Sequence, residues 1–282
     1  MTNEAIGFIR TQKEEPFFLY LPYYNVHTPL QGRPDLVRKY EKILADHRND
    51  TILRNAEFLA MTEAVDNNIG RIMQCLEEED LDMNTLVIFT SDNGGLYRRD
   101  GRHVRASWNH PLRAGKGTLY EGGLRIPTIV HWPGMIRPGR VSDEVIISTD
   151  FFPTLMETCG VSFELEIEGV SLLAHWLHGD AVDRETLYWH YPHYHIGMPG
   201  ATIRDGDYKL IEYYETGHME LYNLNEDIGE RADLAGKYPE KTAELHRKLE
   251  TWRQENRARM PSPNPGYAAD PDRDLIKPNP SP

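Results

Sequence analysis

An aspartate and an asparagine stand directly after a short apolar run, where they could hold a metal ion. Residues 85–90 are rich in β-branched and apolar side chains, the pattern of a buried strand, and Asp92 and Asn93 follow at once. Loops at the carboxyl ends of parallel strands are where α/β proteins bind ligands. A carboxylate and an amide oxygen are hard ligands suited to Ca²⁺ or Mg²⁺. The alternative is a tight turn in which Asp92 caps backbone amides.

Two basic side chains elsewhere in the chain could meet an anion. Lys116 lies between Gly115 and Gly117, so the backbone there can approach a ligand closely and the ammonium can act as a compact point charge. The stretch is not a nucleotide-binding P-loop, because a glycine follows the lysine where Ser or Thr is required. His27, in a loop after the apolar run 17–21, could donate to an oxyanion or protonate a leaving group. A flexible loop lysine and a hydrogen-bonded surface histidine are the alternatives.

The segment that separates the Asp92 and Lys116 motifs, residues 96–115, is polar and aperiodic, which predicts a long loop. Loops of this length in compact domains are usually functional. Its basic side chains could therefore contact a substrate, with a solvated loop face as the equal alternative. These side chains belong to His103, Arg105, His110 and Arg113.

A dense cluster of histidines and aromatic residues occupies positions 189–195. Its spacing matches no standard set of zinc ligands, which disfavours a metal site. The flanking aromatic rings instead favour a rim that could stack on a sugar ring. Within this rim, His193 is the candidate for contact with substrate.

The elements that must position these residues follow an α/β pattern. Residues 17–21 and 85–90 have the composition of buried strands, and apolar spacings of three and four predict a long helix between about 50 and 79. A helix between two apolar strands is the crossover unit of a parallel sheet. We therefore predict an α/β core with a parallel or mixed sheet flanked by helices, and a further strand over 126–132. Additional helices are expected over 2–13, 150–158 and 172–177.

The pattern changes after residue 179 to short strand-like segments separated by turns. An Asp-Gly dipeptide at 205–206 is a strong hairpin signal, and apolar spacing predicts a helix over 239–257. A small antiparallel sheet with a covering helix is therefore expected. The strand-like segments are 186–191, 201–204, 207–213 and 219–224. The predicted parts of the chain are a domain over 1–180, a C-terminal antiparallel subdomain over 181–260 and a Pro-rich tail over 261–282.

Composition limits the partners of this chain. Of its 282 residues, 31 are Lys or Arg and 44 are Asp or Glu, so the formal net charge is −13, which disfavours binding to nucleic acid. An anionic substrate would therefore need the few cations concentrated at one site. No apolar run approaches 18 residues, so no membrane span is expected. Cys75 and Cys159 are too few for a disulfide framework, and we expect both to be core thiols.

Three motifs, in their order and spacing, together resemble the arylsulfatase family. They are His27-Thr28-Pro29, the stretch 91–94, and residues 115–123 followed by an Arg and a Pro at 125 and 127. The hairpin at 204–210 and the strand at 220–224 are similar to the C-terminal part of that family. The resemblance covers residues 2 to about 265, nearly the whole chain.

The resemblance implies an alkaline-phosphatase-like fold, one bound calcium ion and hydrolysis of sulfate esters. Members of the family use a formylglycine nucleophile made from the Cys or Ser of a C/S-x-P/A-x-R motif. By resemblance, Asp92 and Asn93 are calcium ligands. His27 and Lys116 are the residues that hold the substrate sulfate, one of them near the bridging oxygen. The histidine rim and the habit of the family together favour a sulfated carbohydrate as substrate.

The chain also departs from the family pattern. Neither cysteine and no serine fits the nucleophile motif, and the chain has no Asp-Asp dipeptide and no Lys-x-His element. These features normally precede the His27 loop, so the chain resembles the C-terminal half to two-thirds of a sulfatase without its nucleophile segment. Asp92 and Asn93 supply two of the six to eight oxygen ligands that Ca²⁺ requires, so we predict that the chain binds calcium weakly. We expect no turnover by this chain alone.

Two alternatives to a sulfuric ester hydrolase remain. One is a phosphodiesterase or phosphonate hydrolase of the same superfold, since the same cations suit either anion. The other is a non-catalytic or degenerate protein that binds sulfated glycans. The first twenty residues lack the apolar core of a signal peptide, so a periplasmic or secreted location is an expectation from the family only. No oligomeric state is predicted.

Overall fold

The chain folds into two compact units, each assembled from two separate stretches of sequence. The first comprises residues 1–90 and 127–184, and the second comprises residues 91–126 and 185–282. The computed structural model describes residues 1–46, 55–97, 107–262 and 264. The domain boundaries expected at 180 and 260 stay predictions. Residues 91–126, which carry two of the three motifs, fold in the same unit as the C-terminal sheet.

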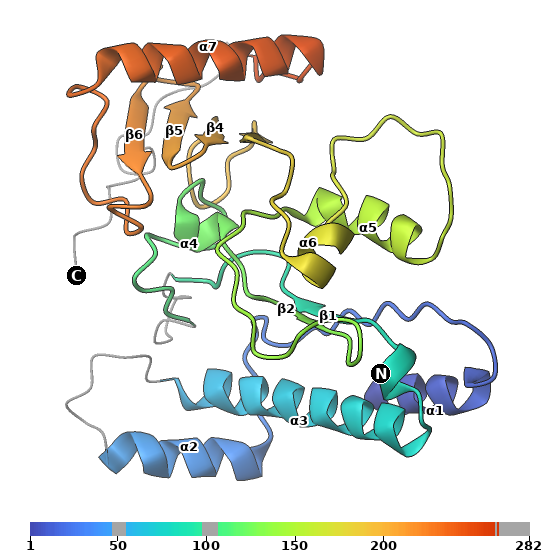
Figure 1. Cartoon of the computed structure of the whole chain (residues 1–282). Coiled ribbons are helices and arrows are strands. Elements are labelled where there is room, and N and C mark those ends of the chain that lie inside the picture. Colours follow the sequence, from blue (N-terminus) through green and yellow to red (C-terminus); the bar gives the residue numbers. More distant parts are fainter. Residues whose placement is uncertain (47–54, 98–106, 263, 265–282) are drawn as a thin grey trace. The chain divides into compact units, whose positions relative to one another are not determined.

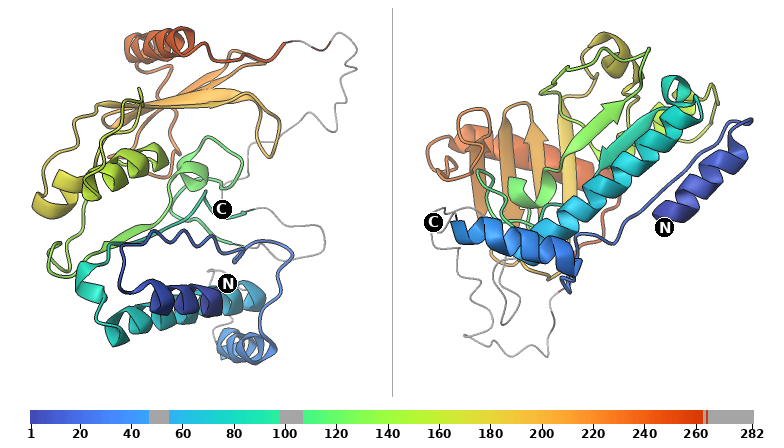
Figure 2. Two further views of the ribbon diagram at one scale, coloured as in Figure 1. Left: turned by 90° about the vertical axis from the view of Figure 1, so that its right-hand side faces the viewer. Right: turned by 90° about the horizontal axis from the view of Figure 1, so that it is seen from below.

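Helices of the first unit pack around α3 (Ala56–Glu78), the long helix that the apolar spacing predicts. Its first turn is capped by Asn55, whose side chain accepts the backbone N–H of Phe58 at 3.1 Å. The amphipathic helix α1 (Thr2–Gln12) lies alongside α3 (Figure 2). Ile9 of α1 packs with Cys75 and Leu76 of α3, and all three are buried. The helix α2 (Pro34–Asp46), which the sequence analysis does not anticipate, also packs on α3.

Two short strands of the first unit form an antiparallel pair. The strand β1 (Val87–Thr90) pairs with β2 (Thr128–His131), and Thr90 lies opposite Thr128. The prediction of a strand over residues 17–21 is wrong. Within the described residues this segment is extended but pairs with no strand, and Phe18 and Tyr20 are 72% and 77% exposed. An apolar run favours burial, but only a neighbouring backbone can supply the ladder that makes a strand.

Four short elements complete the first unit, and one of them ends at Asp150. They are the short 3-10 turns η1 (Asp82–Asn84) and η2 (Ser148–Asp150), and the helices α5 (Phe151–Thr158) and α6 (Leu173–His178). The fully buried carboxylate of Asp150 accepts the backbone N–H groups of Ile147 and Val170 at 2.9 and 3.1 Å and pairs with Arg184. Cys159, expected in the core, is exposed because it stands at the end of α5. None of the described helices has the length and apolar composition that a bilayer crossing requires.

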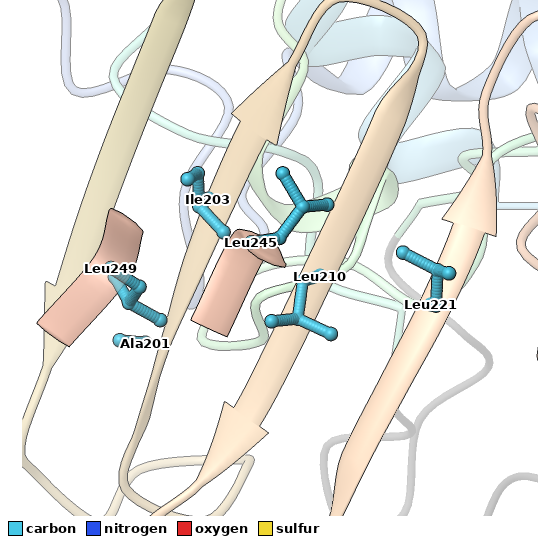
Figure 3. Packing of buried hydrophobic residues seen from close by; sticks show 6 residues of the cluster. All are labelled: Ala201, Ile203, Leu210, Leu221, Leu245 and Leu249. Atoms are coloured by element: carbon cyan, nitrogen blue, oxygen red, sulfur yellow. The ribbon is translucent and has the colours of Figure 1, made fainter. Parts of the chain in front are cut away.

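The second unit is built on a four-stranded antiparallel sheet. Its strands lie in the order β3-β4-β5-β6 and span Thr186–Tyr191, Gly200–Asp205, Tyr208–Tyr213 and Met219–Asn223. The helix α7 (Pro239–Glu255) covers one face of this sheet (Figure 1). The core between them is shown in Figure 3 and consists of Ala201, Ile203, Leu210, Leu221, Leu245 and Leu249. The predicted small sheet with a covering helix is confirmed.

A second cluster of apolar side chains lies outside the core that packs against α7, because side chains alternate between the two faces of each strand. Ile211, Tyr213 and Tyr222 pack there with Leu119, which lies in the loop that contains Lys116. Successive side chains of a strand point to opposite faces, so neighbours such as Leu210 and Ile211 serve different clusters. The sheet therefore supports the Lys116 loop directly. The loop continues into the short helix α4 (Glu121–Leu124).

Candidate functional site

Backbone hydrogen bonds join the Asp92 loop to the Lys116 loop inside the second unit. The N–H of Gly94 donates to the carbonyl of Gly123 at 3.0 Å, and the N–H of Lys116 donates to the carbonyl of Gly95 at 3.1 Å. These bonds tie residues that are more than twenty positions apart in sequence. The structure therefore brings the Asp92–Asn93 pair and Lys116 into one local assembly.

Gly94 stands where no side chain could be accommodated. A Cβ added at this position would lie 1.7 Å from the carbonyl oxygen of Gly122. The close approach of the two loops therefore requires glycine at 94.

Asn109 connects the two loops through its side-chain amide. Its Oδ1 accepts the N–H of Gly95 at 3.2 Å, while Nδ2 donates to the carbonyls of Gly95 and Ala114 at 2.8 and 2.9 Å. A side chain with one acceptor and two donors satisfies backbone groups that would otherwise need water. Asn109 is not predictable from the sequence, because an asparagine in a polar loop carries no signal of its partners.

A buried ion cluster holds the far end of the Lys116 loop. Nζ of Lys209 lies 2.9 Å from Oε1 of Glu121 and 2.9 Å from Oε1 of Glu230, and all three side chains are buried. Oε2 of Glu230 also accepts the backbone N–H of Glu121 at 2.7 Å. Burial raises the pKa of the Glu230 carboxyl, because desolvation outweighs the attraction of Lys209. Buried charges of this kind persist only when paired, so the cluster fixes the position of α4.

Arg113, named above as a possible substrate contact, is instead part of the support beneath the loop. Its guanidinium carbon lies 4.0 Å from the centroid of the Tyr120 ring, and Nη1 donates to the Tyr222 hydroxyl and to the Glu230 carbonyl, each at 2.8 Å. The hydroxyls of Tyr120 and Tyr222 both donate to Oε2 of Glu220 at 2.8 Å. Burial is the main cause that raises the pKa of both phenols, so they remain protonated donors.

His27 lies in the first unit, whereas Asp92, Asn93 and Lys116 lie in the second. Its ring Nδ1 is 2.7 Å from the carbonyl oxygen of Thr28. A carbonyl can only accept, so Nδ1 carries a proton, and a second donor at Nε2 would require the imidazolium form. The convergence of His27 with Lys116 stays a prediction.

The other predicted substrate contacts are three histidines. His103 lies outside the described residues. His110 is exposed in the second unit and stacks against Trp108, with ring centroids 6.2 Å apart. His193 is exposed after β3, with its ring edge-on to Tyr191 at 5.8 Å. Both remain predictions as contacts with substrate.

A histidine that was not selected from the sequence lies against the Lys116 loop. The three atoms nearest to a Cβ built on Gly117 all belong to the His195 ring, with Nδ1 at 2.2 Å. The N–H of Gly197 donates to the carbonyl of Gly117 at 3.1 Å. Gly117 has a φ of +79°, which glycine tolerates best. The aromatic cluster after β3 therefore reaches the residue next to Lys116.

The Asp92–Asn93 pair suits a hard cation in its chemistry but supplies only part of a coordination shell. Asp92 is exposed, and the hydroxyl of Ser91 donates to the carbonyl of Asn93 at 3.2 Å. Calcium takes six to eight oxygen ligands. In the part of the chain that the structure describes, no three His, Cys, Asp or Glu side chains gather to form a metal site. The calcium site therefore stays a prediction.

Comparison with known proteins decides the family. The profile of the sulfatase family matches residues 1–161, more than half of the chain. This chain belongs to the sulfatase family. A second profile, described as N-sulphoglucosamine sulphohydrolase, C-terminal, matches residues 114–255. The family predicted from the three motifs is confirmed.

Individual relatives and a solved structure extend the match over nearly the whole chain. A protein described as a sulfatase from Formosa agariphila is 35% identical over 91% of this chain and 50% of its own length. N-acetylgalactosamine-6-sulfatase of Rattus norvegicus is 33% identical over 83% of this chain and 41% of its own. The crystal structure of Ps i-CgsB in complex with k-i-k-neocarrahexaose shares 27% identity, with a TM-score of 0.76, over 90% of this chain and 54% of that one.

These comparisons confirm the predicted alkaline-phosphatase-like α/β class of this sulfatase chain. They also show its extent, since the chain spans about half the length of the relatives that it matches. The activity of a whole sulfatase is therefore a proposal for this chain.

Proposed function

We propose that this chain forms the sulfate-holding part of a sulfatase that hydrolyses sulfate esters on carbohydrate. In this proposal Lys116 and His27 bind the sulfate, and Asp92 and Asn93 contribute oxygens to a calcium ion. The observation that supports the proposal is the backbone junction between Gly95 and Lys116, which joins the loop of Asp92 and Asn93 to the loop of Lys116. Membership of the sulfatase family supports the same assignment.

The chemistry of sulfate transfer requires such a group of residues. Charge develops on the equatorial oxygens and on the leaving oxygen, and a cation, an ammonium and an imidazolium are the groups that stabilise it. In a chain of net charge −13, these cations must be collected at one place. A bound calcium ion would supply further positive charge at the sulfate oxygens.

The nucleophile is the component that this sequence lacks. No Cys or Ser in the 282 residues stands in a C/S-x-P/A-x-R motif. We therefore propose that the chain binds sulfate esters but does not turn them over by itself. A non-catalytic protein that binds sulfated glycans is the second candidate, and the same missing motif favours it.

A sulfated carbohydrate is the substrate class that two observations favour. One relative is described as N-acetylgalactosamine-6-sulfatase, and one structural neighbour is bound to a neocarrahexaose. In this chain, histidine and aromatic side chains follow β3, and one of them reaches the turn that contains Lys116. The rings could stack on a sugar face.

Binding of inorganic sulfate to the full chain in the presence of Ca²⁺ tests the proposal, measured by calorimetry or by amide chemical shifts. Lys116→Ala should weaken this binding at least about tenfold, because a charge-assisted contact is lost. Lys237→Ala, at an exposed lysine in the same unit, is the control and should leave it unchanged. Equal affinity of both variants would contradict the proposal. Calcium-dependent hydrolysis of an aryl sulfate by this chain would contradict the account of the missing nucleophile.

A further inference from the structure

His195 is placed by backbone contacts rather than by its own hydrogen bonds. The segment that joins β3 to β4 is attached to the Lys116 loop through the N–H of Gly197, which donates to the carbonyl of Gly117 at 3.1 Å. The N–H of His195 itself faces the Gly197 carbonyl at 3.4 Å, which closes a tight turn. This turn holds the imidazole against Gly117.

The His195 ring presents one edge to Gly117 and another away from it. Nδ1, Cε1 and Cγ are the ring atoms nearest to a Cβ built on Gly117, so Nε2 is the nitrogen farther from the loop. The residue as a whole is exposed. The edge that carries Nε2 is therefore the one farther from the Gly117 backbone.

The bonding of His195 differs from that of two other histidines, His190 and His175, in which both ring nitrogens have partners. Both ring nitrogens of His190 have partners, the Tyr214 hydroxyl at 2.5 Å and the Arg259 carbonyl at 3.0 Å. Both nitrogens of His175 are likewise bonded, to Ser142 and to the carbonyl of Asp180. For His195, no ring hydrogen bond is found to any residue that the structure describes. His190 and His175 serve the fold, whereas the His195 ring retains its hydrogen-bonding capacity.

We propose that His195 is a specificity-determining residue that contacts the sugar bearing the sulfate. This inference rests on the proposed function, because Lys116 must first bind the sulfate. A neutral imidazole offers one donor and one acceptor, which suits a hydroxyl group, whereas sulfate oxygens only accept. The ligand class is therefore a hexose or hexosamine sulfate with a free hydroxyl near the sulfated carbon. The proposal assigns the sulfate group itself to Lys116 and His27, and the sugar to His195.

The test compares two ligands on the full chain with Ca²⁺ present. Galactose 6-sulfate and inorganic sulfate are titrated into the unaltered chain, His195→Ala and His195→Gln. His195→Ala should weaken binding of the sugar sulfate about three- to tenfold, the effect of one hydrogen bond, and leave inorganic sulfate within twofold. His195→Gln should recover part of the loss, since its amide offers both a donor and an acceptor. His178→Ala, at an exposed histidine of α6, is the matched control.

The outcomes separate this inference from the function on which it rests. If Lys116→Ala weakens inorganic sulfate but His195→Ala leaves the sugar sulfate unchanged, the inference fails and the proposed function stands. An equal loss for both ligands in His195→Ala would show that the ring only shapes the turn, which also overturns the inference. If neither ligand binds, or if both bind independently of Lys116, the proposed function fails and the role of His195 fails with it.

Discussion

Lys209 and Glu121 form an ion pair in the interior of the second unit, with Nζ 2.9 Å from Oε1 and both side chains buried. Lys209 belongs to the C-terminal sheet, and Glu121 belongs to the end of the Lys116 loop. The pair therefore couples the position of the candidate sulfate-binding loop to the folding of the sheet.

Removal of the Lys209 ammonium should destabilise the second unit strongly. Lys209→Met leaves the buried carboxylate of Glu230 without its cation and leaves Glu121 with Arg204 at 4.0 Å. Breaking a buried pair in this way costs about 3–5 kcal/mol. Urea unfolding followed by tryptophan fluorescence measures the free energy of unfolding. Lys237→Met, at an exposed position, should change it by less than about 0.5 kcal/mol. A similar free energy for the two variants would show that the cluster does not stabilise the fold.

Stability should depend on pH through Glu230. Burial raises the pKa of this carboxyl above its ordinary value of 4.5, so the folded chain holds the proton more tightly than the unfolded chain. The free energy of unfolding should therefore decrease as pH rises from about 4.5 through the raised pKa, by at most about 1.4 kcal/mol per pH unit. Glu230→Gln keeps an oxygen for the N–H of Glu121 and has no proton to lose.

The measurement is a series of urea unfolding curves between about pH 4.5 and pH 8. In Glu230→Gln the free energy of unfolding should decrease less steeply with pH than in the unaltered chain. The control is Glu226→Gln, at an exposed glutamate of the same unit, which should retain the original slope. A slope unchanged by Glu230→Gln would assign the pH dependence to other groups.

Substitution by alanine should be tolerated at Gly70 but should destabilise the fold at Gly94. At Gly94 the new methyl group would meet the carbonyl oxygen of Gly122 at 1.7 Å, so the junction of the two loops must open. At Gly70, inside α3, nothing lies within 4 Å. Gly94→Ala should lose more than about 2 kcal/mol of stability together with sulfate binding. Gly70→Ala should gain about 0.5–1 kcal/mol from helix propensity.

Calorimetric affinity for sulfate and urea unfolding of both glycine variants check this prediction. Normal sulfate binding by Gly94→Ala would mean that the junction at Gly94 is not needed for the Lys116 loop to adopt its binding geometry. The Gly70 variant, in the first unit, shows that a loss in Gly94→Ala comes from the position and not from the added methyl group.

The amino-acid sequence determined the elements whose evidence is local. Short strand-like segments separated by turns, one of them at 205–206, predicted the four strands of the C-terminal sheet, and apolar spacing predicted α3 and α7. Motif order was enough to indicate the sulfatase family, because it depends on residue types alone. The same apolar signal was misleading over residues 17–21, where the run is extended but has no strand partner among the described residues.

Only the tertiary structure decided which side chains support the site. Nothing in the sequence distinguishes Asn109 from other loop asparagines or shows that Arg113 points onto Tyr120. Nor does the sequence reveal that His195 lies on Gly117 while His193 lies on Tyr191. Periodicity records the preference of a residue for burial or exposure. The partner of a polar side chain is chosen by contacts between distant segments, which exist only once the chain has folded.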